Sequence, residues 1–223
     1  MKKIILILFL FFLLYACYYI YNATIDNKTD ITLLGDNTLN NPYFKELGEV
    51  NNIFVNADYH MIDLLDIIKY NKEIDNKNVH QILRNTDILI ISIGMNDIYY
   101  KLNDNLYEVY TYMNNIINNY EEILKYISKY NYKEVYILGY YDIYNKYNDI
   151  FTYTNYKLNN LANLYGFTYL NLNKIFYNND KLLQKRDKFD LNNDGYRKIY
   201  ELIVEKLNNY WYNIKCVYYY DLY

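Results

Sequence analysis

The sequence predicts an α/β protein in which a parallel β-sheet is covered by helices on both faces. Short apolar runs and segments of helical periodicity alternate five times along the 223 residues. The connections between the apolar runs are long enough to hold helices, as parallel strands require. One run, residues 87–93, is almost entirely apolar and rich in β-branched side chains, which is typical of a strand buried on both faces.

The expected strands are apolar runs that end in glycine or in polar residues. The first run leads directly into Gly35 and Asp36, which predicts a strand that continues into a loop. Parallel strands bring their carboxyl ends to one edge of a sheet, and the ligands of such sheets bind at that edge. The expected strands are residues 31–34, 53–55, 87–93, 134–139 and 167–172.

The expected helices carry apolar residues at steps of three or four. The longest, residues 106–130, has a continuous stripe that begins with Val109, Met113 and Ile116. Gly166 closes another helical pattern, at a position typical of a helix C-cap. The expected helices are residues 61–69, 106–130, 156–165 and about 195–211.

Composition argues against several classes of protein. The net charge of −3 argues against a protein that binds nucleic acid over its whole surface, and the single proline argues against a Pro-rich chain. Two cysteines cannot form a disulfide framework, and two histidines leave little for a histidine-rich metal site. We therefore expect one globular domain with no cofactor and no nucleic-acid partner.

The amino terminus has the character of a membrane-directing segment. Lys2 and Lys3 precede residues 4–21, which hold no charged residue and are just long enough to span a bilayer. Three interpretations remain open: an uncleaved anchor with its lysines in the cytoplasm, a cleaved secretory signal, or a lipoprotein signal lipidated at Cys17. The bulky Tyr15 and the apolar residues after Cys17 favour the anchor.

These interpretations divide the chain into three parts. We expect a signal or anchor with a short linker at residues 1–28, a domain at residues 29–215 and a tail at residues 216–223. In all three interpretations the domain lies outside the cytoplasm, either tethered to a membrane or secreted. Cys216 is then a lone thiol, most simply a packed residue near the carboxyl terminus.

Three short motifs follow the ends of expected strands or precede the last helix. Residues 35–38 read G-D-N-T, residues 94–97 read G-M-N-D, and residues 187–196 read D-K-F-D-L-N-N-D-G-Y. Together and in this order they resemble the motifs of the SGNH, or GDSL, hydrolases. The resemblance covers the chain from about residue 31 to the last helix. It implies a three-layer α/β/α sandwich with a flavodoxin-like sheet, and descent from esterases and acyl hydrolases.

The resemblance also implies roles for individual positions, and two catalytic positions are substituted. Asn37 stands where these enzymes have their serine nucleophile, and Asp190 stands where they have their histidine base. Asp187 matches the carboxylate that orients that histidine, and Asn96 matches the asparagine of the oxyanion hole. The glycine that supplies another oxyanion donor is absent, and we predict Tyr59 at its position.

The substitutions decide which chemistry is expected. A carboxamide cannot serve as the nucleophile of acyl transfer, which must be an activated oxygen or sulfur. A carboxylate is also a far weaker base than histidine. We therefore expect an inactive esterase-like domain that binds a glycan, an acyl ligand or a protein partner near Asn96, Gly94 and Asp36. The alternative is a divergent ester hydrolase, a carbohydrate or lipid deacylase, with a non-standard centre at Asp36, Asp190 and His60.

A calcium-loop pattern overlaps the last motif. Its ligand positions would be Asp190, Asn192, Asp194 and Glu201, with a glycine at the turn. However, the position that is normally apolar in such a loop is taken by Arg197. The hydrolase motif accounts for the same residues, so we expect no metal site.

Two histidines and a tyrosine pair need separate interpretations. His60 lies near the end of the second strand, where a surface or helix-starting role is favoured over that of a substitute base. His80 begins a separate helical stretch and is expected to be structural. Tyr140 and Tyr141 follow the fourth strand, so they are well placed to line a pocket.

Overall fold

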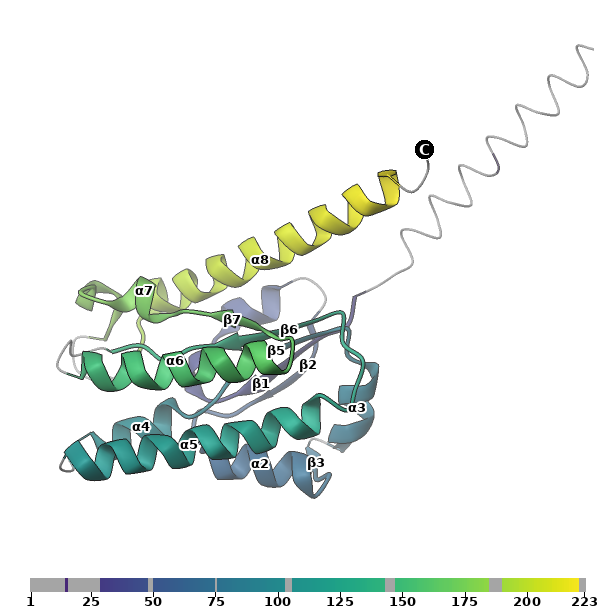
Figure 1. Cartoon of the computed structure of the whole chain (residues 1–223). Helices are drawn as coiled ribbons and strands as arrows, with labels where there is room; N and C mark the ends of the chain where they lie inside the picture. The colour runs from purple at the N-terminus through teal and green to yellow at the C-terminus, as the bar shows by residue number, and fades with distance from the viewer. Residues whose placement is uncertain are drawn as a thin grey trace, which may run out of the picture.

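The computed structural model places a five-stranded sheet between two layers of helices (Figure 1). It describes Tyr15 and residues 29–47, 50–74, 76–102, 106–142, 147–184 and 190–220. All neighbouring strands of the sheet are parallel, in the order β2-β1-β5-β6-β7. The strands are β1 (Ile31–Gly35), β2 (Val50–Val55), β5 (Ile88–Ser92), β6 (Glu134–Leu138) and β7 (Thr168–Leu170).

These strands confirm the α/β sandwich and the flavodoxin-like order of the sheet. The α-helices are α2 (Met61–Lys69), α3 (Val79–Asn85), α4 (Met95–Lys101), α5 (Leu106–Ile127), α6 (Asn148–Leu164), α7 (Asn173–Phe176) and α8 (Asn193–Tyr220). Short 3-10 helices lie at η1 (Asn37–Leu39), η2 (Pro42–Glu46) and η3 (Asp180–Leu182), and β3 (Glu73–Ile74) pairs with β4 (Lys77–Asn78) in a small hairpin.

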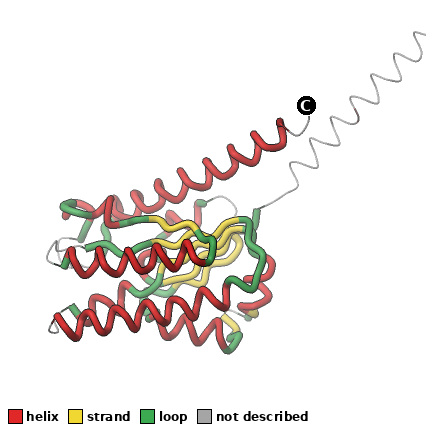
Figure 2. Tube along the Cα trace, in the orientation of Figure 1, coloured by secondary structure: helices red, strands yellow, loops and turns green. Residues whose placement is uncertain are grey.

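The helices form one layer on each face of the sheet. Helix α8 covers one face, while α2 and α5 cover the other, and α6 packs against α5 (Figure 1). Figure 2 shows the strands, in yellow, twisted together between the helices of the two layers, in red. Every residue of β1 and of β5 is buried, because these strands lie inside the sheet and are covered on both faces.

Element boundaries differ from the sequence-based expectation most clearly at α6 and α8. Helix α6 begins at Asn148 instead of residue 156, because Ile150 and Phe151 pack into the core although Asp and Thr residues lower the helix propensity of this turn. Helix α8 continues to Tyr220, past the expected end near residue 211. Helix α4 was not expected, since its seven residues are too few for a clear period.

The expected membrane-directing segment is not part of this description. Residues 4–21, apart from Tyr15, lie outside the described residues, and so does Cys17. Among the residues that the structure does describe, none forms a helix both long and apolar enough to traverse a membrane.

Candidate functional site

The first motif turns sharply at the carboxyl end of β1, and Asp36 holds the turn. Its backbone N–H donates to the carbonyl oxygen of Ser92, at 2.9 Å. Its carboxylate accepts from the backbone N–H of Thr38, at 3.1 Å, and of Met95, at 3.0 Å. Burial raises the pKa of Asp36 to about 6, although these hydrogen bonds favour the ionised form. Because Asp36 is fully buried, it braces the two motifs and presents no surface to a ligand.

The two positions at which the motif resemblance predicts substitutions lie together. The side-chain amide of Asn37 donates to Oδ1 of Asp190, at 2.9 Å, across 153 residues of sequence. The phenol of Tyr196, on the first turns of α8, donates toward the main-chain and side-chain oxygens of Asn37, at 3.3 and 3.4 Å. Burial and the nearby charge of Asp190 raise the pKa of Tyr196 to about 12, so this hydroxyl remains a donor. The contacts of Asn37 thus join β1 to the start of α8.

The second motif begins α4, and Gly94 sets its direction. Gly94 has a φ of +104° at the N-cap of the helix. A Cβ atom there would lie 2.8 Å from the hydroxyl oxygen of Tyr140 and 2.9 Å from the terminal methyl of Met61. Both the backbone angle and the lack of space therefore require glycine.

Asn96 lies at the expected edge of the sheet, but its donors are engaged. Its amide nitrogen donates to the carbonyl oxygens of Ala57, at 2.6 Å, and Tyr59, at 2.9 Å. The backbone N–H of Tyr59 donates to the carbonyl oxygen of Asn56, at 3.1 Å. Both candidate oxyanion donors are thus already hydrogen-bonded to carbonyl oxygens of the loop that follows β2. An oxyanion hole needs donors aimed at open space, so these residues would have to move before they could stabilise one.

A histidine and a carboxylate pair beside this loop. Nδ1 of His60 lies 3.4 Å from Oδ1 of Asp97, whose other oxygen accepts from the backbone N–H of Met61 at 2.8 Å. Burial raises the pKa of Asp97, while the Met61 N–H and His60 oppose that rise. The His60 side chain is 45% exposed, whereas that of Asp97 is 8% exposed. In the sequence, His60 lies near the end of the second strand and Asp97 ends the second motif. Nothing in their spacing indicated that these two residues pair.

The calcium pattern does not form a loop in the structure. Its residues from Asn193 onward belong to α8. The side chain of Asn192 donates to the carbonyl oxygens of Lys181 and Leu183, at 2.6 and 3.0 Å. Asp194 and Glu201 form ion pairs within the helix, with Arg197 and Lys198 as their partners. Across the described part of the chain, no three His, Cys, Asp or Glu side chains are grouped to hold a metal ion.

The remaining sequence-predicted residues divide between the core and the undescribed part of the chain. The prediction that Tyr140 and Tyr141 line a pocket is wrong, because they are 1% and 3% exposed. The hydroxyl of Tyr140 donates to the carbonyl oxygen of Ile93, at 3.0 Å, and Tyr141 stacks on Phe176.

His80 contacts the carbonyl oxygen of Ile68 with its Nε2 at 2.6 Å, which is a structural contact. Asp187 lies outside the described residues.

Comparison with known proteins relates this fold to esterases. No protein-family model and no curated protein matches the sequence. An acetylxylan esterase from Geobacillus stearothermophilus aligns with a TM-score of 0.61 and 12% identity, over 79% of this chain and 93% of the esterase. A lipase/acylhydrolase from Enterococcus faecalis aligns with a TM-score of 0.57 and 18% identity, over 81% of this chain and 96% of the enzyme.

A gut microbial diltiazem-metabolizing enzyme aligns with a TM-score of 0.60 and 15% identity over 79% of this chain, which spans 46% of that enzyme's length. These similarities, together with the order of the strands, show that the chain has the SGNH hydrolase fold. The expectation from the three motifs is confirmed at the level of the fold.

Proposed function

We propose that this chain is an SGNH-fold domain that no longer hydrolyses esters and instead binds a glycan, an acyl ligand or a protein partner. The observation that carries the proposal is the hydrogen bond from Asn37 to Asp190, at 2.9 Å. These residues stand at the positions of the serine and the histidine in the motifs. Their contact is a structural link between an amide donor and a carboxylate acceptor, with no nucleophile in it.

The physical argument concerns the missing proton transfer. An acyl-transfer nucleophile must lose a proton to a base as it attacks, and an amide is unsuited to that step. Loss of even one member of a catalytic triad reduces turnover by several orders of magnitude. The hydrogen bonds that Asn96 donates also disfavour ester hydrolysis. An oxyanion would have to compete with two loop carbonyl oxygens for the Asn96 amide.

The test is ester hydrolysis by the full chain and by the double variant Asn37→Ser with Asp190→His. Acetylated xylo-oligosaccharides and short-chain acyl esters are the substrates. We expect no turnover by the parent and measurable turnover by the double variant, because the variant restores a hydroxyl beside an imidazole. Asn40→Ser is the matched control, since Asn40 is an exposed asparagine on the same turn. Turnover by the parent that survives Asn40→Ser and is lost in Asn37→Ala would contradict the proposal.

A divergent hydrolase is the second candidate, and the His60–Asp97 pair favours it. A carboxylate on Nδ1 fixes the imidazole tautomer and leaves Nε2 as the proton acceptor, which suits a general base that activates water. If the parent hydrolyses esters, His60→Gln should abolish the activity, and Asp97→Asn should reduce it. Turnover that is unchanged in His60→Gln excludes this candidate.

We also propose that the domain acts outside the cytoplasm, tethered to a membrane or secreted. The support is the sequence of residues 1–21, with two lysines before an uncharged apolar stretch. Fractionation of cells that express the full chain tests this, with protease added to intact cells. Labelling with a fatty acid distinguishes lipidation from a plain anchor, because only a lipoprotein incorporates the label and loses it in Cys17→Ser. A protein found wholly in the cytosolic fraction would refute the proposal.

A further inference from the structure

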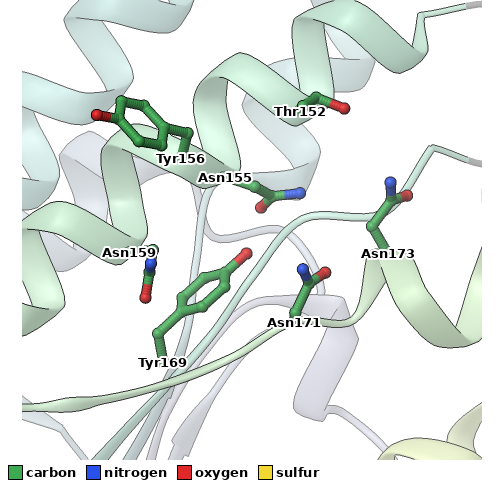
Figure 3. Close-up of a pocket in the computed structure, with 7 residues that line it drawn as sticks. All are labelled: Thr152, Asn155, Tyr156, Asn159, Tyr169, Asn171 and Asn173. Atoms are coloured by element: carbon green, nitrogen blue, oxygen red, sulfur yellow. The ribbon is translucent and has the colours of Figure 1, made fainter.

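A pocket of about 240 Å³ lies between α6 and the carboxyl end of β7, on the edge of the sheet away from β1. Figure 3 shows seven side chains around it. Four come from α6, one from β7, one from the segment after β7 and one from the first residue of α7. They are Thr152, Asn155, Tyr156, Asn159, Tyr169, Asn171 and Asn173. None of them belongs to the three hydrolase motifs.

The side chains that line the pocket carry no charge. Four of the seven side chains are carboxamides, which both donate and accept hydrogen bonds, and one is a hydroxyl. The remaining two are phenols, which add flat apolar faces to the polar set. Such a lining does not suit an ion, because a buried charge needs an opposite charge or several strong dipoles. It suits a neutral molecule that carries many hydroxyl groups on an apolar ring.

Two polar atoms at this pocket have no hydrogen-bond partner among the described residues. They are the hydroxyl of Tyr169 and the side-chain oxygen of Asn171, and both atoms are buried. In Figure 3 the Tyr169 phenol points between Asn155 and Asn171. An unsatisfied buried polar atom destabilises a fold, so such atoms usually have a water or a ligand as partner. Burial raises the pKa of Tyr169, which keeps its hydroxyl as a donor.

The wall of the pocket is fixed by hydrogen bonds to the backbone. Asn155 accepts from the N–H of Tyr140 and donates to its carbonyl oxygen, both at 2.8 Å. Asn173 accepts from the N–H of Asp142, at 2.9 Å. These contacts tie α6 and the start of α7 to the segment after β6. The site is therefore built before a ligand arrives, which reduces the entropy lost on binding.

We propose that this pocket binds a neutral saccharide, with one sugar ring seated among the four asparagines and against the Tyr156 and Tyr169 rings. The volume would hold roughly eight water molecules at about 30 Å³ each, which is enough for a single ring but below the size of most drug-binding pockets. Once their side chains turn toward the pocket, Tyr169 donates to one ring hydroxyl and the side-chain oxygen of Asn171 accepts from another. This site is separate from the Asn37–Asp190 contact, so the inference does not depend on the loss of ester hydrolysis.

The test is binding of methyl glycosides of xylose, glucose, galactose and N-acetylglucosamine to the full chain, followed by calorimetry or by NMR titration. We expect saturable binding in the millimolar range for at least one of them, and none for glucuronate, which carries a charge. Tyr169→Phe should weaken binding roughly threefold to tenfold, because it removes one hydrogen bond. Its melting temperature should stay equal or rise, since the deleted hydroxyl is unsatisfied.

Three matched variants make the result decisive. Asn171→Ala should weaken binding like Tyr169→Phe, whereas Tyr107→Phe should not, because Tyr107 is 81% exposed and lies outside the pocket. Asn37→Ala should also leave binding unchanged. Absence of binding by every neutral glycoside would overturn the inference, as would binding that Tyr169→Phe and Asn171→Ala both leave unchanged. Binding lost only in Asn37→Ala would place the ligand at the motif site, which overturns this inference but supports the proposed function.

Discussion

At the scale of single residues, the retained motif positions serve mainly to hold the fold together. Asp36 links the turn after β1 to the start of α4, and Asn96 clamps the loop after β2 through two carbonyl oxygens. Asn37 adds a third link, to Asp190. These contacts brace the turns at the carboxyl edge of the sheet.

The burial of Asp36 predicts a pH-dependent stability. The folded pKa of about 6 lies above the ordinary value of 3.8, so between these two pH values the folded state binds more protons than the unfolded state. Asp36 therefore contributes its full stability below about pH 4, and that contribution falls by about 3 kcal/mol as the pH rises through 6. Urea unfolding of the parent and of Asp36→Asn between pH 4 and pH 7 measures this.

The expected result is that the stability difference between the parent and Asp36→Asn shrinks as the pH rises. The difference between the two free energies of unfolding cancels the contribution of the other carboxyl groups, because those groups titrate in both proteins. A difference that stays constant from pH 4 to pH 7 would mean that Asp36 titrates near its ordinary value.

At the scale of elements, the end of α6 illustrates how local chemistry fixes a boundary. The N–H of Phe167 donates to the carbonyl oxygen of Ala162, at 2.8 Å, and the N–H of Gly166 donates to that of Asn163, at 3.1 Å. This is the Schellman arrangement, with Gly166 in the left-handed region at a φ of +73°. The sequence predicted this C-cap correctly, because a glycine after a periodic segment is a local signal.

Gly166→Ala should destabilise the protein by about 1 to 2 kcal/mol, the free-energy difference for a residue with a Cβ in the left-handed region. A Cβ atom at this position would contact nothing within 4 Å, so no steric clash adds to that value. Asn160→Ala, on an exposed turn of the same helix, is the control and should change stability little. The free energy of unfolding in urea gives both values. An unchanged stability in Gly166→Ala would argue against the left-handed cap.

At the scale of the whole molecule, one apolar core joins the sheet to both helical layers. Ile90 lies in β5, paired with β1 on one side and β6 on the other, and is fully buried. Ile90→Ala should therefore lower the free energy of unfolding by about 2 to 5 kcal/mol, through lost burial and the remaining cavity. Ile62→Ala, at a side chain that is 52% exposed, should lower it by less than about 1 kcal/mol.

Thermal unfolding followed by circular dichroism and by tyrosine fluorescence checks this prediction. With a single core, the two signals should change together in the parent and in both variants. Separate transitions in the parent would show that the sheet and a helical layer unfold independently. Equal losses in Ile90→Ala and Ile62→Ala would contradict the burial of β5.

The sequence by itself determined the order and type of the main elements. Apolar periodicity and capping residues act over a few neighbours, so they were sufficient for β5, α2 and the end of α6. Two of the three motifs follow strands and the third precedes the last helix, and their resemblance to the SGNH hydrolase motifs predicted the fold correctly. Through the same resemblance they predicted that Asn37 and Asp190 stand at the serine and histidine positions.

Only the tertiary structure decided which of these residues meet. The contact between Asn37 and Asp190, the engagement of Asn96 by loop carbonyls and the pairing of His60 with Asp97 join segments that are distant in sequence. The pocket around Tyr169 gave no signal, because asparagine and tyrosine are abundant throughout the chain. Hydrogen-bond partners depend on distances of a few tenths of an ångström, which the packing of the whole sheet fixes and no local pattern encodes.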